Sequence, residues 1–396
     1  MLESVFPDKD LTAEQQKIFE QILSFSNQAV KNNQRSVFQL NGDAGTGKSI
    51  ILTKLFLKIE KDAKLNKTNN YFLVNHPELL KVYQENAGEF PELRKNHFLR
   101  PTTFINTMHK SDKYADVVVI DEAHLLLSES DNYNNFTQKN QLEEIIKLSK
   151  VVILVFDARQ VLKLKSYWSQ SLLNKIVKQL NVNYMQATLT TQMRMQAPKT
   201  VIDWINDLTE KKRVDPVIQK NTDYLTLDTK YDFRIYKDAQ TMYQALKSKN
   251  NQVGESRIVS TADYPSTLDG KKHYVNEGQF HLPWDQYNYS HTTWAQKPET
   301  INEIGSIYTV QGFDLQYVAV IIGPSIVSDG GNKIKVDLSK YEDQEAFKKR
   351  HDNDIAQLDD AKKQIILNSM NVLLKRGIKG CFVYFHDPKI YKYLNK

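Results

Sequence analysis

The chain has 396 residues, about twice the length of a typical single domain, so we expect two globular units with separate cores. Hydrophobic residues make up 40% of the chain and charged residues 25%, which excludes a disordered or fibrous protein. Lysine and arginine number 53 against 47 acidic residues, and this formal charge of +6 is too small to identify a polyanionic partner by itself.

The cysteine content indicates the redox environment of the protein, and the apolar runs indicate whether it enters a membrane. The single cysteine, Cys381, cannot form an internal disulfide or a thiolate zinc cluster, so we expect a reducing, cytoplasmic environment. The first residues lack the basic and apolar segments of an export signal. The longest apolar runs are far shorter than the ~18 residues that span a membrane, so we expect no membrane segment and no membrane partner.

Short apolar runs alternate with amphipathic stretches up to about residue 195, which predicts a parallel sheet covered by helices on both faces. An amphipathic helix is expected over residues 49–62, where apolar side chains recur at helical spacing. Four runs rich in β-branched or aromatic residues are predicted to be strands: 36–40, 71–74, 117–120 and 151–156.

A second set of short apolar runs occurs in the second half of the chain, where strands are predicted at 257–260, 318–322 and 381–385. We therefore expect two α/β domains, 1–195 and 196–396. Residues 263–300 are crowded with aromatic side chains and are predicted to form a long irregular insertion packed on them. The densely charged residues 328–363 are predicted to form a solvated loop and helix.

One loop carries the clearest chemical signature. Residues 42–49, GDAGTGKS, fill the pattern G-x-x-x-x-G-K-[ST] between a predicted strand and a predicted helix. Such a loop binds the phosphates of ATP through backbone N–H groups, the Lys48 ammonium and the Ser49 hydroxyl, which also ligates Mg²⁺. The loop residues expected around the phosphates are Gly42, Ala44, Gly45, Thr46 and Gly47. The alternative is a glycine-rich turn that matches the pattern by chance.

An acidic pair follows the predicted strand at 117–120. Asp121 is expected to hold hydrated Mg²⁺, and Glu122 to orient and deprotonate the attacking water. An acidic pair at this position is alternatively a favourable charge at a helix N-terminus. Together with the phosphate loop, the pair favours ATP hydrolysis.

Five further segments share a pattern with one family. They are LTAEQ (11–15), FDARQ (156–160), LTTQMR (189–194), EIGSIYTVQGFD (303–314) and VLLKRG (372–377). With the phosphate loop and the acidic pair, the chain resembles, nearly end to end, a superfamily 1 helicase, and more narrowly the Schlafen group 3 DNA/RNA helicase domain family of bacteria.

The resemblance implies roles for residues of the first half. Gln15 is the candidate that reads adenine, although a glutamine at a helix start is alternatively just solvated. Gln160 is implied to sense the γ-phosphate and link it to the second domain. Arg194 is implied to reach the γ-phosphate, and Trp204 follows at a spacing that the family also shows.

In the second half, the resemblance implies that Gln311 and Gly312 couple the nucleotide state to nucleic-acid binding. It also implies that Asp314 lies near the ribose. Arg376 is implied to be a second arginine finger, and a surface arginine before a glycine turn is the alternative. The tryptophans of a family-specific aromatic stretch are matched by Trp284 and Trp294.

Three positions depart from the family pattern. Lys375 stands where threonine is usual, Met370 where an aromatic residue is usual, and Leu125 where arginine is usual. These changes leave the hydrolytic groups in place but affect the coupling between hydrolysis and movement. ATP hydrolysis is therefore better supported than unwinding.

The expected fold is α/β, with two RecA-like parallel-sheet domains of the P-loop NTPase class and an ATP cleft between them. The expected function is an ATP-dependent, Mg²⁺-requiring motor on single-stranded DNA or RNA. The protein is expected to be a monomer. Contacts to nucleic acid are expected from the aromatic insertion and from Thr102, Thr103 and His109.

Two other functions stay open. An ATP-operated switch could bind nucleic acid and recruit or gate a partner nuclease without processive unwinding. A kinase of small molecules or polynucleotides could also use a phosphate loop, although it gives no reason for the segment around Gln311 or for two arginine fingers. Strong, salt-sensitive stimulation of ATP turnover by nucleic acid favours the motor.

Overall fold

The computed structural model describes residues 10–43, 45–62, 68–131, 135–217, 219–227, 230–266, 271–286, 294–310, 314–348 and 358–396. These residues form two compact units. The first contains the described residues up to Val161 and Lys165–Met193, and the second contains Leu162–Leu164 and the described residues from Arg194 onward. The chain therefore passes from the first unit to the second between Met193 and Arg194.

The first unit is built on a six-stranded sheet in which every neighbouring pair is parallel. Its strand order is β3-β2-β4-β5-β1-β6, so β5 lies between β4 and β1. The four predicted strands are confirmed as β1, β2, β4 and β5. The bounds are β1 Ser36–Gly42, β2 Asn70–Val74, β3 Phe98–Leu99, β4 Ala115–Asp121, β5 Ser149–Phe156 and β6 Asn183–Leu189.

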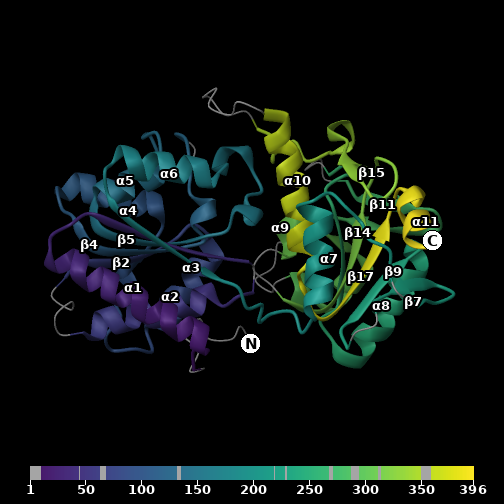
Figure 1. Cartoon of the computed structure of the whole chain (residues 1–396), viewed down its shortest axis with the longest axis horizontal. Helices are drawn as coiled ribbons and strands as arrows, with labels where there is room; N and C mark the ends of the chain where they lie inside the picture. The colour runs from purple at the N-terminus through teal and green to yellow at the C-terminus, as the bar shows by residue number, and fades with distance from the viewer. Residues whose placement is uncertain are drawn as a thin grey trace. The chain divides into compact units, whose positions relative to one another are not determined.

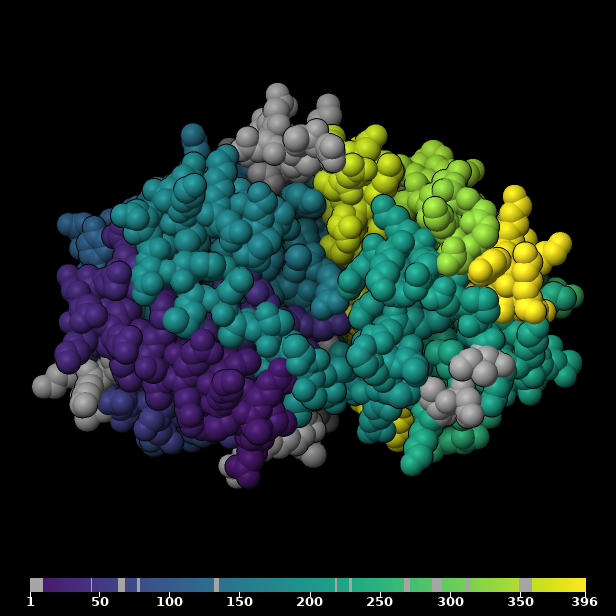
Figure 2. All heavy atoms as spheres, in the orientation of Figure 1, coloured from purple at the N-terminus to yellow at the C-terminus, as the bar shows by residue number. Residues whose placement is uncertain are grey.

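Helices cover both faces of this sheet (Figure 1). Alternate strand residues point to opposite faces: Val119 and Ile153 join the hydrophobic cluster that includes α1 and α2, and Val118 and Val152 join the cluster that includes α4 and α5. The bounds are α1 Ala13–Lys31, α2 Lys48–Lys61, α3 Pro77–Ala87, α4 Pro101–Ser111, α5 Gln141–Lys147 and α6 Gln170–Gln179. The solvent side of α1 forms part of the surface seen in Figure 2.

The second unit contains a nine-stranded sheet in the order β11-β12-β13-β10-β14-β17-β9-β8-β7. Its strands from β12 to β9 are parallel, and antiparallel pairs complete both edges. The three predicted strands are confirmed as β10, β14 and β17. The bounds are β7 Gln219–Lys220, β8 Tyr224–Thr226, β9 Asp232–Tyr236, β10 Arg257–Ser260, β11 His273–Glu277, β12 Phe280–Trp284, β13 Ile304–Gly305, β14 Leu315–Ile322 and β17 Gly377–Phe385.

The remaining elements of the second unit surround this sheet. A separate antiparallel pair consists of β15 and β16. The bounds are β15 Ile326–Ser328, β16 Ile334–Val336, α7 Lys199–Thr209, α8 Ala239–Val253, α9 Ile307–Val310, α10 Leu358–Leu374 and α11 Pro388–Leu394. Both units are thus mixed α/β layers on largely parallel sheets, which confirms the predicted fold class.

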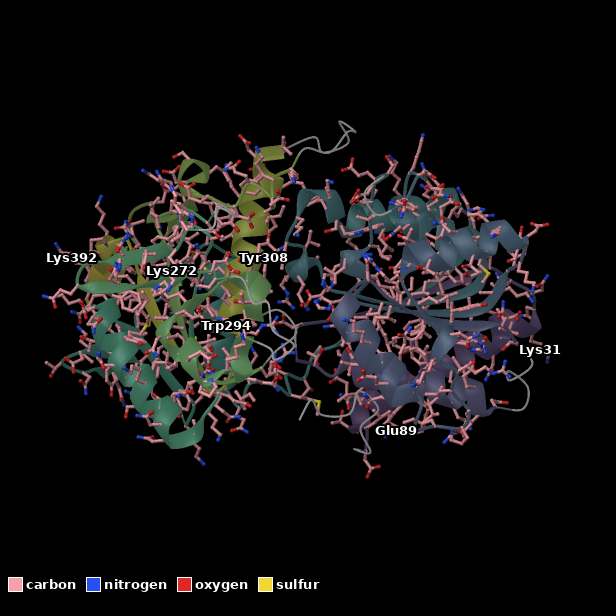
Figure 3. All side chains as sticks on the ribbon, turned by 180° about the vertical axis from the view of Figure 1, so that it is seen from behind. Lys31, Glu89, Lys272, Trp294, Tyr308 and Lys392 are labelled. Atoms are coloured by element: carbon pink, nitrogen blue, oxygen red, sulfur yellow. The ribbon has the colours of Figure 1, made fainter. Side chains whose placement is uncertain are left out.

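The irregular insertion predicted over residues 263–300 is wrong in part. It contains the hairpin β11–β12, which extends the sheet because Trp284 pairs with Ile304 of β13. Its tryptophans do pack inward: Trp284 and Trp294 are buried, and Figure 3 shows Trp294 within the second unit. The hairpin turns at Gly278, whose φ of +61° suits glycine, and the aromatic residues Phe280 and Trp284 of β12 are buried.

The solvated loop and helix predicted over residues 328–363 are also wrong in part. The described residues include strand β16 and the buried side chains of Tyr341 and Ala346. Residues 349–357 lie outside the described part of the chain. In β16, charge density was misleading because Lys335 alternates with the buried Ile334 and Val336.

Across the described residues, no helix combines the length and the apolar composition that crossing a bilayer requires.

Candidate nucleotide site

The phosphate loop joins β1 to α2 in the first unit. Gly45 and Gly47 have φ values of +83° and +81°, a conformation that suits glycine. A Cβ atom at Gly47 would meet the Gln15 amide, so a side chain there would displace Gln15 from the loop. The buried Lys48 ammonium donates to the carbonyl oxygens of Gly42 (2.7 Å) and Asp43 (2.8 Å). The loop thus has the backbone turn and the cation of a phosphate-binding site, and Ala44 lies outside the described residues.

Thr46 closes the turn from inside the loop. Its backbone N–H and its hydroxyl both donate to the carbonyl of Asp43, at 3.3 Å and 2.9 Å. A Cβ atom at Gly42 would lie 2.7 Å from Oγ1 of Thr46, so the close approach depends on glycine at that position too. These contacts give the loop a defined shape.

Asp121, at the end of β4, lies beside the start of α2. The Ser49 hydroxyl donates to Oδ1 of Asp121 at 3.3 Å, and the backbone N–H of Glu122 donates to the same oxygen at 3.0 Å. The hydroxyl of Tyr83 donates to Oδ2 at 2.7 Å. The structure therefore brings together the hydroxyl and the carboxylate that the sequence indicates as ligands of Mg²⁺.

These two oxygen donors fit Mg²⁺. This ion is commonly held by few protein oxygens, with water and substrate phosphates completing its shell. Among the described residues, no group of three or more His, Cys, Asp or Glu side chains is arranged to hold a metal ion. A site made from Ser49 and Asp121 accordingly suits a cation that arrives with a nucleotide.

Burial raises the pKa of Asp121 to about 6, and the nearby charge of Glu122 adds to the increase. Hydrogen bonds from Tyr83 and Ser49 oppose it because they stabilise the ionised form. The carboxylate is therefore ionised at neutral pH, at an energetic cost that a bound cation would relieve.

Glu122 occupies a left-handed backbone conformation, with φ +52° and ψ +49°, and its carboxylate is partly exposed. Its Oε2 lies 3.4 Å from Nε2 of His124. Burial lowers the pKa of His124 to about 4, so this imidazole is neutral at pH 7. No role was predicted for His124 from the sequence. Its position two residues after Glu122 was the feature that could have indicated one.

Asp157, directly after β5, connects the loop to the next segment. It accepts hydrogen bonds from the Gln160 amide (2.9 Å) and from the backbone of Arg159 (3.0 Å), and lies 3.9 Å from Nζ of Lys48. Arg159 reaches Oδ1 of Asp43 in the loop at 3.4 Å. Sequence analysis named this segment but assigned a role to Gln160 alone. The position of Asp157 at the end of a buried strand indicated a functional residue. It could be assigned to the phosphate loop only once β5 was known to lie beside β1.

Gln15 is buried against the phosphate loop, so the alternative of a solvated glutamine is wrong. Its amide donates to the Thr46 carbonyl (3.3 Å) and to the sulfur of Met193 (3.1 Å). Its side-chain oxygen accepts from the backbone of Thr12, which completes a capping box at the start of α1. To pair with a base, the Gln15 amide must exchange its contacts to the loop and to Met193.

Met193 itself donates its backbone N–H to the carbonyl of Gly45 at 2.8 Å. Arg194, the next residue, belongs to the second unit. Its Nε lies 2.6 Å from Oδ1 of Asp314, and both side chains are partly exposed. The structure thus pairs two residues for which the sequence implied separate contacts to the nucleotide.

Arg376 is buried, so the alternative of a surface arginine is wrong. The parallel register pairs Leu315 of β14 with Gly377 of β17, and Leu315 donates its N–H to the Arg376 carbonyl at 3.1 Å. Asp314 and Arg376 therefore precede neighbouring strands at the same edge of this sheet. Gln311 and Gly312 lie outside the described residues.

Lys375, which departs from the family pattern, is also buried. Its ammonium donates to Oδ1 of Asn206 at 2.7 Å and so ties the end of α10 to α7. The departure gives this side chain a structural contact within the second unit.

The residues expected to touch nucleic acid divide into two groups. Thr102 is buried and accepts a hydrogen bond from Gln141 at 3.0 Å, so the interpretation of Thr102 as a surface contact is wrong. Thr103 and His109 lie on the exposed side of α4, and His109 is 3.0 Å from Oε2 of Glu144. Trp204 is buried against Phe233 and therefore serves packing.

Comparison with known proteins identifies the family. The model of the "Schlafen group 3, DNA/RNA helicase domain" matches residues 35–387. Protein YPL245W of Saccharomyces cerevisiae is 39% identical over 407 residues, covering 96% of this chain and 89% of that protein. The chain belongs to the Schlafen group 3 DNA/RNA helicase domain family. The expectation of a specifically bacterial family is not supported, because this relative is a yeast protein.

Solved structures with a similar arrangement include two Pif1 helicases. One comes from a study of DNA unwinding at forked double-stranded DNA by two coordinating Pif1 helicases, with a TM-score of 0.36, 10% identity, and coverage of 94% of this chain and 92% of the other. The other is Pif1 from Candida albicans, with a TM-score of 0.35, 11% identity, and coverage of 94% and 95%.

Proposed function

We propose that this protein is a superfamily 1, Mg²⁺-dependent ATPase that works as a motor on single-stranded DNA or RNA. It consists of two RecA-like domains, 1–195 and 196–396, and hydrolyses ATP in a cleft between them. It acts as a monomer in the cytoplasm. The observation that carries the proposal is the convergence of Lys48, Ser49 and Asp121 at the carboxyl ends of β1 and β4.

The first domain supplies the hydrolytic groups. Backbone N–H groups of the loop and Lys48 bind the phosphates, and Ser49 and Asp121 hold Mg²⁺, which supplies charge neutralisation when bound. Glu122 accepts the proton of the attacking water, and its partly exposed carboxylate is accessible for this role. Gln160 senses the γ-phosphate and is held by Asp157, which also faces Lys48.

The second domain supplies the charges that respond to ATP. Arg194 follows Met193, whose backbone is bonded to the phosphate loop, so chain connectivity keeps this arginine within a short distance of the nucleotide. Binding to the γ-phosphate requires Arg194 to exchange its contact with Asp314. Arg376 acts as the second finger, and differential binding of ATP and ADP to these groups drives the motion.

The test is steady-state ATP turnover with single- and double-stranded DNA and RNA at two salt concentrations. We expect stimulation of at least about ten-fold by single strands, weakening steeply as salt rises, because phosphate contacts release counterions. The variant Lys48→Ala should lose turnover with every ligand. Turnover that does not respond to nucleic acid favours a switch that recruits or gates a nuclease, and transfer of phosphate to a nucleoside or a 5′-hydroxyl end indicates a kinase.

A further inference from the structure

Tyr83 lies at the centre of the acidic pocket, although it belongs to none of the motifs. It projects from α3, is almost fully buried, and donates its hydroxyl proton to Oδ2 of Asp121 at 2.7 Å. The other oxygen of Asp121 accepts from the Ser49 hydroxyl, so the Asp121 carboxylate lies between the phenol and the second residue that fits Mg²⁺.

The ring of Tyr83 is held in place by two aromatic neighbours. Its centroid lies 4.8 Å from that of Phe72 on β2, and it stacks on Phe98 on β3 at 6.2 Å with an interplanar angle of 15°. Aromatic packing fixes the ring plane, and the ring plane fixes the direction of the hydroxyl. The hydroxyl thus has a defined position before any ligand binds.

The two oxygens of Asp121 are consequently used differently. Oδ2 is bonded by Tyr83, whereas Oδ1 is bonded by Ser49 and by the backbone N–H of Glu122. Hydrogen bonds to the outer oxygen of a ligating carboxylate set its orientation and its affinity for the metal. We propose that Tyr83 is a positioning residue of the magnesium site, which holds the Asp121 carboxylate with Oδ1 turned toward Ser49. This inference rests on the proposed function and deepens it.

The variant Tyr83→Phe tests the inference because it removes the hydroxyl and keeps the ring that packs on Phe72 and Phe98. Binding of a fluorescent ATP analogue is measured by titration with Mg²⁺ and, separately, in EDTA. We expect the half-saturating Mg²⁺ concentration to rise by about ten-fold or more, the effect typical of losing an outer-shell partner of a metal ligand. Binding in EDTA should stay at the wild-type level.

The matched control is Tyr243→Phe. Tyr243 is also buried and its hydroxyl also makes one side-chain hydrogen bond, to Asn302 at 3.0 Å, but it belongs to α8 of the second unit. This variant should keep the wild-type Mg²⁺ titration. Thermal unfolding of each variant without ligand reports any general loss of stability.

A double variant shows whether Tyr83 acts through Asp121. In an Asp121→Asn background, the change Tyr83→Phe should have little further effect on the Mg²⁺ titration. Full additivity overturns the inference, as does an unchanged titration in Tyr83→Phe or an equal loss of binding in EDTA. Failure of the wild-type protein to bind the analogue at all is a different result, because it removes the proposed function itself.

Discussion

Asp121 combines two requirements that conflict. Burial makes its charge costly, which raises its pKa to about 6, yet the proposed chemistry needs the ionised form at neutral pH. Three hydrogen bonds, from Tyr83, Ser49 and the backbone of Glu122, keep that form accessible. A site that is strained by its own charge without a cation is well suited to binding MgATP.

Glu122→Gln should separate nucleotide binding from hydrolysis. The amide keeps the size of the side chain but cannot accept a proton, so we expect ATP to bind with near-normal affinity and turnover to fall at least about 100-fold. Equilibrium binding and steady-state turnover are measured on the same preparation. The control Glu143→Gln removes one charge from a partly exposed position of α5, where Glu143 pairs with Lys147. Normal turnover in Glu122→Gln would exclude Glu122 as the base.

Asp263, three residues after the end of β10, offers a pH test away from the nucleotide site. Its Oδ2 accepts hydrogen bonds from Thr261 and Ser325, but Oδ1 is buried without a hydrogen-bond partner. Burial raises its pKa to about 6, and the hydrogen bonds from Ser325 and Thr261 oppose this increase. The folded state therefore holds a proton that the unfolded state, with a pKa of about 3.9, has already released between these pH values.

It follows that the stability contributed by Asp263 is greatest below about pH 4 and is lost as pH rises through about 6. The asparagine of Asp263→Asn cannot titrate. The free energy of unfolding of this variant, relative to that of the wild type, should therefore increase by up to about 3 kcal/mol between pH 4 and pH 7. Denaturant unfolding at several pH values measures the difference. A difference that is constant with pH would contradict the assigned cause.

At the scale of elements, the shape of the phosphate loop depends on the first turn of α1. Gln15 caps α1 through Thr12 and at the same time contacts the loop carbonyl of Thr46. The space that Gln15 occupies is the space that a side chain at Gly47 would need. The loop is thus shaped by Gln15, which lies more than thirty positions before Gly47 in the chain.

Gly47→Ala should weaken ATP binding because the new methyl group displaces the Gln15 amide from the loop and the backbone keeps a φ of +81°. Gly278→Ala is the control: its φ is +61°, but no atom lies within 4 Å of the new Cβ. Both variants incur the left-handed strain of about 1–2 kcal/mol, and only Gly47→Ala should weaken binding of a fluorescent ATP analogue. Equal binding by the two variants would show that the contact with Gln15 is unimportant.

In the second sheet, some strands could be predicted from the sequence pattern and others could not. The buried strands β10, β14 and β17 were predictable because each contains a short run of apolar residues, at 258–259, 318–322 and 381–385. The hairpin β11–β12 was missed because its Tyr, His, Pro and Trp content hides the alternation that would mark a strand. Its pairing with β13 also depends on tertiary contacts that no local pattern encodes.

For the whole molecule, the proposal requires a residue of the second unit to affect chemistry at the first. Arg376→Ala should therefore bind ATP nearly as well as the wild type and hydrolyse it at least about ten-fold more slowly. Arg376→Lys, which keeps the charge but loses the planar fork, should recover part of the rate. Because Arg376 is buried, thermal unfolding of both variants is measured as well. Wild-type turnover in Arg376→Ala would mean that this arginine takes no part.

Sequence alone determined the phosphate loop, the acidic pair and the buried strands that carry them, because each depends on residues close together in the chain and on a local period. The tertiary structure decided the neighbours: Asp157 beside Lys48, Tyr83 on Asp121, Gln15 beneath Gly47, and Arg194 on Asp314. These pairs depend on strand order and on the packing of side chains from distant segments. A free energy of contact between such segments arises only when the whole core has formed, so no stretch of sequence specifies it by itself.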